Sequence, residues 1–190
     1  MGYAKLKAKI SVEDYISGEE ISQIRHEFLD GEVYAMAGAS QNHNRIAMNF
    51  SNTLSRHLEN SLCETYAEGM RVKAAENIFY YPDVLVTCEG NFKNPYFCET
   101  PVLIIEVTLP STIQIDRREK LLAYQQMPSV QEYLVVSQNQ IAVEIHRRQS
   151  DGRWITYYFD RNDEDFTLES VDLKILLTDV YRRVAFEAGA

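Results

Sequence analysis

Tyr81-Pro82-Asp83-Val84-Leu85-Val86 and Leu103-Ile104-Ile105-Glu106-Val107 are the two stretches of sequence that decide the fold of this chain. Each is an apolar run with the length of a buried strand, and each carries one acid, Asp83 or Glu106. A carboxylate in such a run costs free energy unless a cation or hydrogen-bond donors accompany it. We therefore interpret the runs as central strands that, if they are neighbours, bring the two acids together at one end of a sheet.

A lysine follows these acids on a predicted helix over residues 113–127, which ends before Pro128. The i, i+4 spacing places Asp116, Lys120 and Tyr124 on one face of that helix. We expect Leu121 and Leu122 to lie on or near its inner face.

Asp83, Glu106 and Lys120 together suit metal-dependent cleavage of phosphodiesters. Carboxylate oxygens bind Mg²⁺ or Mn²⁺, such an ion generates a hydroxide nucleophile, and a lysine positions water and stabilises developing charge. Two simpler alternatives stay open. Glu106 pairs with Arg71 or Lys120 as a buried ion pair, and Asp83 caps or turns the chain.

The remaining elements follow from periodicity and turn residues. Helical spacing and cap residues predict three further helices, and apolar runs bounded by turn signals predict strands around them. The helices are 11–17 after Ser11, 41–60 after Ser40, and 176–184. The strands are the hairpin 25–36 around Asp30-Gly31, the segments 63–67 and 70–74 as a pair, and 132–137, 141–148 and 154–159. This order predicts a mixed α/β (α+β) domain with a central mixed sheet flanked by helices and an N-terminal hairpin.

Composition narrows the class of protein. At 190 residues with 45% hydrophobic and 25% charged residues, the chain fits one globular domain over residues 1–190. No run approaches a membrane span and no signal-peptide pattern is present, so we expect a cytoplasmic protein. The spacing of Cys63, Cys88 and Cys98 indicates neither a disulfide framework nor zinc, and Cys88 is expected to be buried.

The net charge of −9 is unusual for a protein that holds nucleic acid, which normally presents a basic face. Basic residues nevertheless cluster at 117–120, 146–148 and 182–183. These clusters are either local contacts for phosphate or solvated faces of ordinary elements.

Several segments resemble the Uma-type restriction endonucleases, a branch of the PD-(D/E)XK nuclease superfamily. They are the hairpin 27–36, the Tyr81-Pro82-Asp83-Val84 segment, Ile105-Glu106-Val107 with Pro110-Ser111-Thr112, and the Asp116-x-x-x-Lys120-x-x-x-Tyr124 helix. The resemblance covers residues 11 to 182 and implies a restriction-endonuclease-like core with a Mg²⁺-dependent site.

The resemblance also implies roles for single residues. Asp83 and Glu106 would be the metal-binding motif acids, and Glu27 an additional acid. The superfamily pattern places a lysine two positions after the second acid, where this chain has Thr108. The lysine therefore looks displaced to Lys120.

Two further positions are candidates for contact with the substrate. Tyr124 would supply a hydroxyl near Lys120, and His43 matches a polar position of the family; a surface or capping role is the alternative for His43. The other histidines show no partner pattern, so a histidine metal site or triad is not expected.

The sequence thus predicts a Mg²⁺-dependent DNA endonuclease, with Mn²⁺ as an alternative ion and DNA as the partner. A homodimer through the apolar strands at 132–159 would let each subunit cut one strand. The alternatives are a catalytically silent binding protein with a nuclease fold and a metal-dependent hydrolase of a small phosphorylated molecule.

Overall fold

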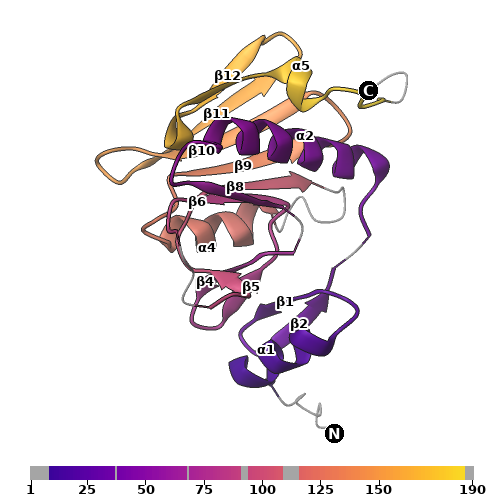
Figure 1. The fold of residues 1–190 in the computed structure, drawn as a ribbon, viewed down its shortest axis with the longest axis vertical. Helices are drawn as coiled ribbons and strands as arrows, with labels where there is room; N and C mark the ends of the chain where they lie inside the picture. The colour runs from indigo at the N-terminus through magenta and orange to yellow at the C-terminus, as the bar shows by residue number, and fades with distance from the viewer. Residues whose placement is uncertain (1–8, 37, 68, 91–93, 109–115, 187–190) are drawn as a thin grey trace, which may run out of the picture.

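A six-stranded mixed sheet forms the centre of the molecule (Figure 1). The computed structural model describes residues 9–36, 38–67, 69–90, 94–108 and 116–186. The sheet order is β11-β10-β9-β8-β6-β3, with β8 and β9 parallel and the other neighbours antiparallel. Its strands are β3 (Glu64–Ala67), β6 (Val84–Thr87), β8 (Pro101–Thr108), β9 (Glu132–Ser137), β10 (Ala142–Arg148) and β11 (Trp154–Asp160).

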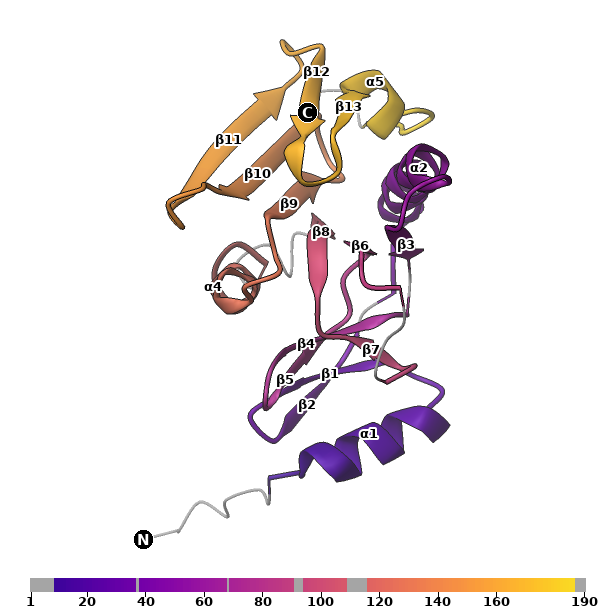
Figure 2. The same ribbon diagram turned by 60° about the vertical axis from the view of Figure 1, so that its left-hand side comes forward.

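The two faces of this sheet are covered by different elements. Helix α2 (Gln41–Leu58) lies over one face, and α4 (Leu121–Gln126) lies over the other (Figures 1 and 2). Side chains alternate along β8, so Leu103 and Ile105 pack into the core below α2, whereas Ile104 packs with α4. Glu106 lies one pleat beyond Ile104 and therefore faces α4.

Helix α2 confirms the predicted amphipathic helix. The Ser40 side chain caps it by accepting a hydrogen bond from the His43 amide at 3.1 Å. Ile46, Phe50 and Leu54 recur every four residues and are at most 1% exposed. Burial of this stripe fixes the helix against the sheet and so fixes the position of its first turn.

A second, five-stranded sheet lies beside the first, in the order β2-β1-β5-β4-β7. It contains the predicted Asp30-Gly31 hairpin, whose two turn residues have φ of +48° and +92°. Helix α1 packs on it through an aromatic core of Tyr15, Phe28, Phe79 and Phe97. Its elements are α1 (Val12–Ile21), β1 (His26–Leu29), β2 (Glu32–Ala35), β4 (Arg71–Ala75), β5 (Ile78–Tyr80) and β7 (Phe97–Cys98).

The predicted pairing of 63–67 with 70–74 is wrong. Strand β3 pairs with β6 in the first sheet, and β4 pairs with β5 and β7 in the second. Between them Gly69 has φ of +120°, which a residue with a side chain rarely adopts. The chain therefore passes from one sheet to the other at the point where the sequence indicated a simple hairpin.

The predicted C-terminal helix over 176–184 is confirmed only in part. Residues 165–176 form a hairpin of β12 (Asp165–Leu168) and β13 (Leu173–Leu176), which a short 3-10 turn (Glu169–Val171) connects. Only Leu177–Val180 forms a helix, α5. Asp172, with φ of +50°, allows the chain to reverse there, and the hairpin is stabilised by packing on the core below α2.

Cys63 and Cys88 form a disulfide, contrary to the sequence-based expectation. The two cysteines lie opposite each other one residue beyond the antiparallel β3–β6 ladder, because Glu64 pairs with Thr87 at the end of that ladder. Cys88 is exposed, so its expected burial is wrong too, whereas Cys98 is buried and free. The pairing depends on the register of two distant strands, which cysteine spacing does not report.

Replacing both Cys63 and Cys88 by serine is expected to lower the free energy of unfolding by about 3 kcal/mol, because the bridge closes a 25-residue loop. Urea denaturation of the wild type with and without reductant measures the effect, and the double serine variant, which has no bridge to reduce, is the control. Unchanged midpoints after reduction would show that the bridge does not stabilise the fold.

Among the helices of the described ranges, none combines the length and the apolarity needed to cross a bilayer.

Candidate active site

The first carboxylate of the site lies where β6 begins, at one end of the central sheet. Val84 pairs with Ile105, so extension of the register by one residue places Asp83 beside Glu106. The Asp83 Oδ2 atom accepts a hydrogen bond from the Val107 amide at 2.6 Å. This charge-assisted bond holds the Asp83 carboxylate against the strand that carries Glu106.

His43 contacts the same carboxylate from the helix side. Its Nε2 atom lies 3.3 Å from Asp83 Oδ2, and the two side chains are 12% and 14% exposed. His43 occupies the first turn of α2, where aligned peptide dipoles favour a nearby negative charge. Ser40 fixes that turn, because it caps the helix and its hydroxyl donates to Gln138 Oε1. The structure thus brings His43 to Asp83, one of the predicted acids.

Glu106 is buried and receives two donors. Its Oε1 atom lies 3.0 Å from Lys120 Nζ and accepts a hydrogen bond from the Tyr124 hydroxyl at 3.3 Å. The Lys120 ion pair considered from the sequence is therefore present. Arg71, the other partner considered, donates instead from Nε to the Tyr96 carbonyl at 3.3 Å. The ion pair places a cation on the predicted motif acid.

Lys120 also joins the two sheets. Its Nζ atom lies 2.9 Å from Glu27 Oε1, on β1 of the five-stranded sheet, and 3.0 Å from Glu106 Oε1. The Tyr80 ring lies 5.4 Å from the ammonium group, in cation–π range. Lys120 is 6% exposed, so both carboxylates act on it in a largely water-excluded setting.

The helical segment behind the site differs in part from its prediction. A π-helical turn over Asp116–Lys120 precedes α4, and the helix ends before Pro128 as predicted. Residues 109–115 and the Asp116 side chain lie outside the described residues. Leu122 is 61% exposed, so its predicted inner position is wrong, because a residue two positions before the buried Tyr124 lies on the opposite side of the helix.

Two tyrosine hydroxyls of the site stay protonated over the physiological range. Burial raises the pKa of Tyr124 well above its usual value, and the Glu106 carboxylate raises it further. Burial likewise raises the pKa of Tyr80 to about 12, with Glu27 contributing. Tyr124 therefore acts as a hydrogen-bond donor to Glu106 and not as a base.

Thr108 occupies the position at which the superfamily pattern places its lysine. It lies two residues after Glu106 on the same face of β8, but its hydroxyl donates to the Val136 carbonyl at 3.3 Å. The side chain is 4% exposed. The cation beside Glu106 comes instead from Lys120.

The donor set fits a hard, hydrated cation. Asp83 and Glu106 supply carboxylate oxygens at one end of the sheet, whereas the described residues include no group of three or more His, Cys, Asp or Glu placed to enclose a metal. Mg²⁺ binds through one or two carboxylates and keeps several waters, so the chemistry of these residues fits Mg²⁺ or Mn²⁺.

Sequence reasoning missed Tyr80 and Gln138, which support the site, and identified Ser40 only as the residue before a helix. Tyr80 packs on Lys120, and Ser40 with Gln138 anchors the turn that carries His43. The Gln138 Nε2 atom also donates to the Thr108 carbonyl at 3.0 Å, at the end of the Glu106 strand. The position of Tyr80 two residues before Pro82 was the sequence feature that could have indicated its role. Gln138 is distant in sequence from the other site residues, and no sequence feature indicated its role.

The two sheets and the helices that cover them define a mixed α/β protein. A solved structure described as a putative nuclease belonging to DUF820, from Anabaena variabilis ATCC 29413, superimposes with a TM-score of 0.73. The match covers 90% of this chain and 97% of the other at 15% sequence identity, so it shows a shared fold.

Residues 12–177 match the Uma2 family, described as "Putative restriction endonuclease", and the chain belongs to this family. Two relatives from Synechocystis sp. (strain ATCC 27184 / PCC 6803 / Kazusa) are both described as uncharacterized. Protein slr1290 is 33% identical over 180 residues, covering 94% of each chain. Protein sll1609 is 32% identical over 154 residues, covering 77% of this chain and 85% of its own.

Proposed function

We propose that this protein is a Mg²⁺-dependent endonuclease that hydrolyses phosphodiester bonds of DNA on a restriction-endonuclease-like core. The observation that carries the proposal is that the Lys120 ammonium group lies 3.0 Å from the Glu106 carboxylate. This contact is at the end of the sheet where Asp83 precedes β6. Family membership supports the same reaction class.

In this proposal Asp83 and Glu106 hold the metal. The Val107 amide orients one carboxylate, and the Tyr124 hydroxyl orients the other. When bound, Mg²⁺ or Mn²⁺ supplies charge stabilisation and lowers the pKa of water.

The remaining side chains act on the substrate and the attacking water. Lys120 orients that water and stabilises charge that develops on the phosphate oxygens. Glu27 shares the ammonium group at 2.9 Å, and so fixes its position between the two sheets. His43 lies beside Asp83 with its side chain 12% exposed, and in this proposal its ring donates to a phosphate oxygen.

The proposal includes a homodimer. Strand β11 is the outer strand at one side of the six-stranded sheet, and Ile155 and Tyr158 on it are 41% and 72% exposed. An exposed strand edge with apolar side chains is a surface that a second copy can cover.

The test is nicking of supercoiled plasmid by the full chain. We expect conversion to nicked and then linear DNA with Mg²⁺ or Mn²⁺. EDTA should abolish cutting, because it removes the metal that the carboxylates would hold. Linear product appearing with the nicked form would support paired cutting by a dimer.

Two results would contradict the proposal. Calorimetry that detects neither Mg²⁺ nor Mn²⁺ binding would favour a catalytically silent binding protein. Hydrolysis of a small phosphodiester such as bis-(p-nitrophenyl) phosphate, without cutting of DNA, would favour a hydrolase of small phosphorylated substrates.

A further inference from the structure

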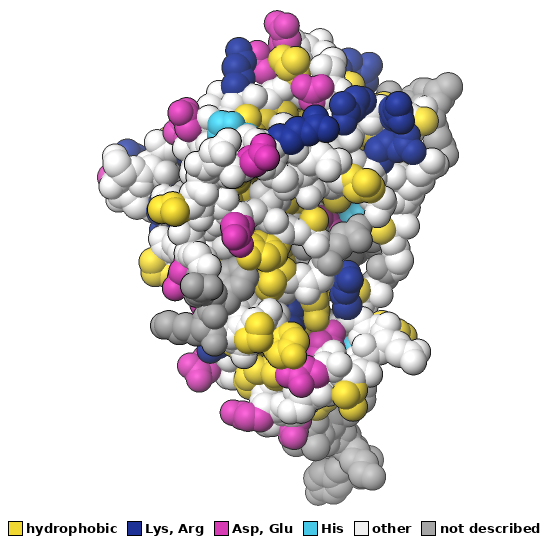
Figure 3. Space-filling view, in the orientation of Figure 1, with side chains coloured by type: hydrophobic (Ala, Val, Ile, Leu, Met, Phe, Trp, Pro, Cys, Tyr) yellow, Lys and Arg dark blue, Asp and Glu magenta, His cyan; other side chains and the backbone are white. Residues whose placement is uncertain are grey.

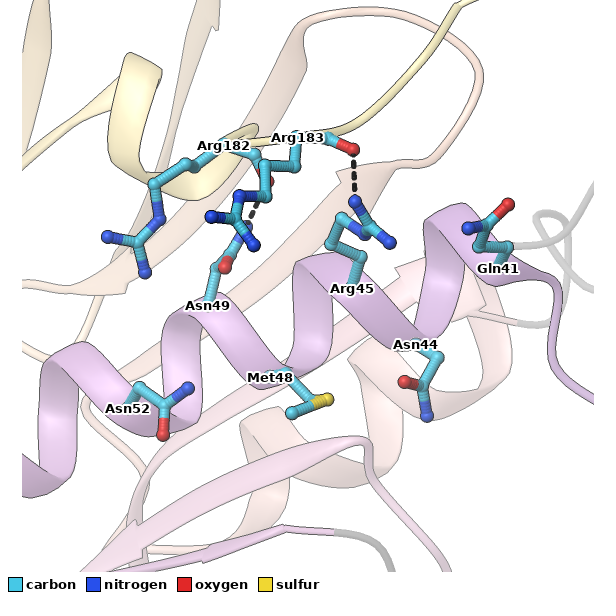
Figure 4. Close-up of a pocket in the computed structure, with 8 residues that line it drawn as sticks. All are labelled: Gln41, Asn44, Arg45, Met48, Asn49, Asn52, Arg182 and Arg183. Carbon is cyan, nitrogen blue, oxygen red and sulfur yellow. Dashed lines mark hydrogen bonds between the residues drawn. The ribbon is translucent and has the colours of Figure 1, made fainter.

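A pocket of about 480 Å³ lies between the outer face of α2 and the chain that follows α5 (Figure 4). Its described lining has no acidic side chain, although the chain carries a net charge of −9. Three arginines and several amides line it, namely Arg45, Arg182, Arg183, Asn44, Asn49 and Asn52. Figure 3 shows Lys and Arg side chains gathered over this part of the surface.

The backbone of the segment that carries Arg182 and Arg183 is hydrogen-bonded to side chains of α2. Asn49 Nδ2 donates to the Val180 and Arg182 carbonyls at 2.9 and 3.1 Å. Arg45 donates from Nη1 to the Arg183 carbonyl at 2.7 Å, as Figure 4 shows. Because these carbonyls are directed at the helix, the segment is fixed, and both arginine side chains remain exposed at the pocket.

Arg183 is held in an unfavourable backbone conformation. Its φ is +61°, the left-handed region that costs a residue with a side chain free energy relative to glycine. Such conformations persist where the surrounding contacts impose them, and they are concentrated at functional sites. The hydrogen bonds from Asn49 and Arg45 therefore hold Arg183 in a backbone conformation that glycine would adopt with less strain.

Basic and amide side chains follow one face of α2 from the pocket towards the C-terminal end of the helix. Arg45, Asn49, Asn52 and Arg56 are spaced by four, three and four residues, which places them on one face of α2. The pocket begins at Gln41 and Asn44, in the same first turn that presents His43 on the inner side of the helix. A helix is about 10–12 Å across, so the pocket and the Asp83 site lie about one helix diameter apart.

We propose that this arginine- and amide-lined pocket binds the phosphodiester backbone of DNA outside the scissile position, an inference that rests on the proposed DNA endonuclease function. Arginine forks pair with phosphate oxygens through two parallel hydrogen bonds, and amide side chains donate to phosphate without reading base sequence. The pocket thus supplies local cationic contacts that the acidic chain as a whole lacks.

The test measures DNA binding separately from cutting. A fluorescein-labelled 30-base-pair duplex is titrated with full-length protein in EDTA at 50 to 200 mM KCl, and anisotropy reports the affinity. We expect Arg182→Gln with Arg183→Gln to weaken binding about tenfold or more at the low salt end. The slope of log affinity against log salt should fall by about two, because each arginine neutralises one phosphate in the wild type.

Two comparisons make this result specific. Arg153→Gln with Lys174→Gln removes the same charge from exposed ion pairs elsewhere and should leave affinity within about twofold. Arg183→Gly should raise the melting midpoint by about 2–4 °C because it relieves the left-handed strain, and yet weaken DNA binding. Equal weakening by both double variants would indicate only an effect of net charge and would overturn the proposal.

Failure of this proposal is distinguishable from failure of the endonuclease proposal. If wild type cuts plasmid and the Arg182/Arg183 double variant binds and cuts equally well, the pocket proposal is wrong and the endonuclease proposal stands. If wild type binds DNA through the arginines but never cuts it, the reverse holds. Absence of any binding by the wild type at 50 mM KCl overturns the pocket proposal.

Discussion

Replacing Glu106 by glutamine is expected to reduce plasmid nicking by about 10³-fold or more, because the variant loses one of the two carboxylates proposed to hold the metal, along with the charge that pairs with Lys120. The protein should remain folded. Glutamine keeps an oxygen that accepts the Tyr124 hydrogen bond, and Lys120 keeps its ion pair with Glu27. Nicking rates in Mg²⁺ and calorimetric titration with Mg²⁺ measure the two expected losses.

Glu132→Gln is the matched control for that variant. Glu132 is also a buried acid of the central sheet, 0% exposed, on strand β9. Its carboxylate lies 2.8 Å from Arg147 Nε and accepts hydrogen bonds from the Ser170 amide and hydroxyl at 2.9 and 2.6 Å, and both residues lie outside the candidate site. It should lose stability without losing activity. Full nicking by Glu106→Gln, or equal loss in both variants, would contradict the role of Glu106.

Lys120→Met should reduce both activity and stability. The nicking rate should fall about 10²–10³-fold because charge stabilisation is lost in a water-excluded site. The free energy of unfolding should fall by about 3–5 kcal/mol, because Glu27 and Glu106 remain without their shared cation. Nicking assays and urea denaturation give the two quantities.

Partner variants separate the two effects of Lys120. Glu27→Gln combined with Lys120→Met removes one of the two opposed carboxylates, so stability should partly return while cutting does not. Lys120→Arg keeps the positive charge and should fold, but a guanidinium group cannot replace the compact ammonium group, so cutting should stay slow. Lys120→Met that cuts at the wild-type rate would show that Lys120 is only a structural ion-pair partner.

The helices and strands that sequence periodicity predicted correctly are those whose burial is set by local pattern. The stripe of Ile46, Phe50 and Leu54 defined α2, and Asp30-Gly31 defined the first hairpin. The predicted pairing of β3 with β4 was wrong, and the β12–β13 hairpin was not predicted. These pairings depend on how the segments pack within the two sheets and against the core, so the local pattern of residues does not predict them.

The sequence by itself determined the central apolar runs and their two acids, Asp83 and Glu106, because a carboxylate in an apolar run is costly wherever that run lies. It also placed Lys120 and Tyr124 one helical turn apart. Only the tertiary structure decided that Lys120 lies between Glu106 and Glu27, that His43 meets Asp83, and that Cys63 bonds to Cys88. Those contacts depend on sheet register and on how the two sheets and helices pack, which are long-range properties of the folded chain.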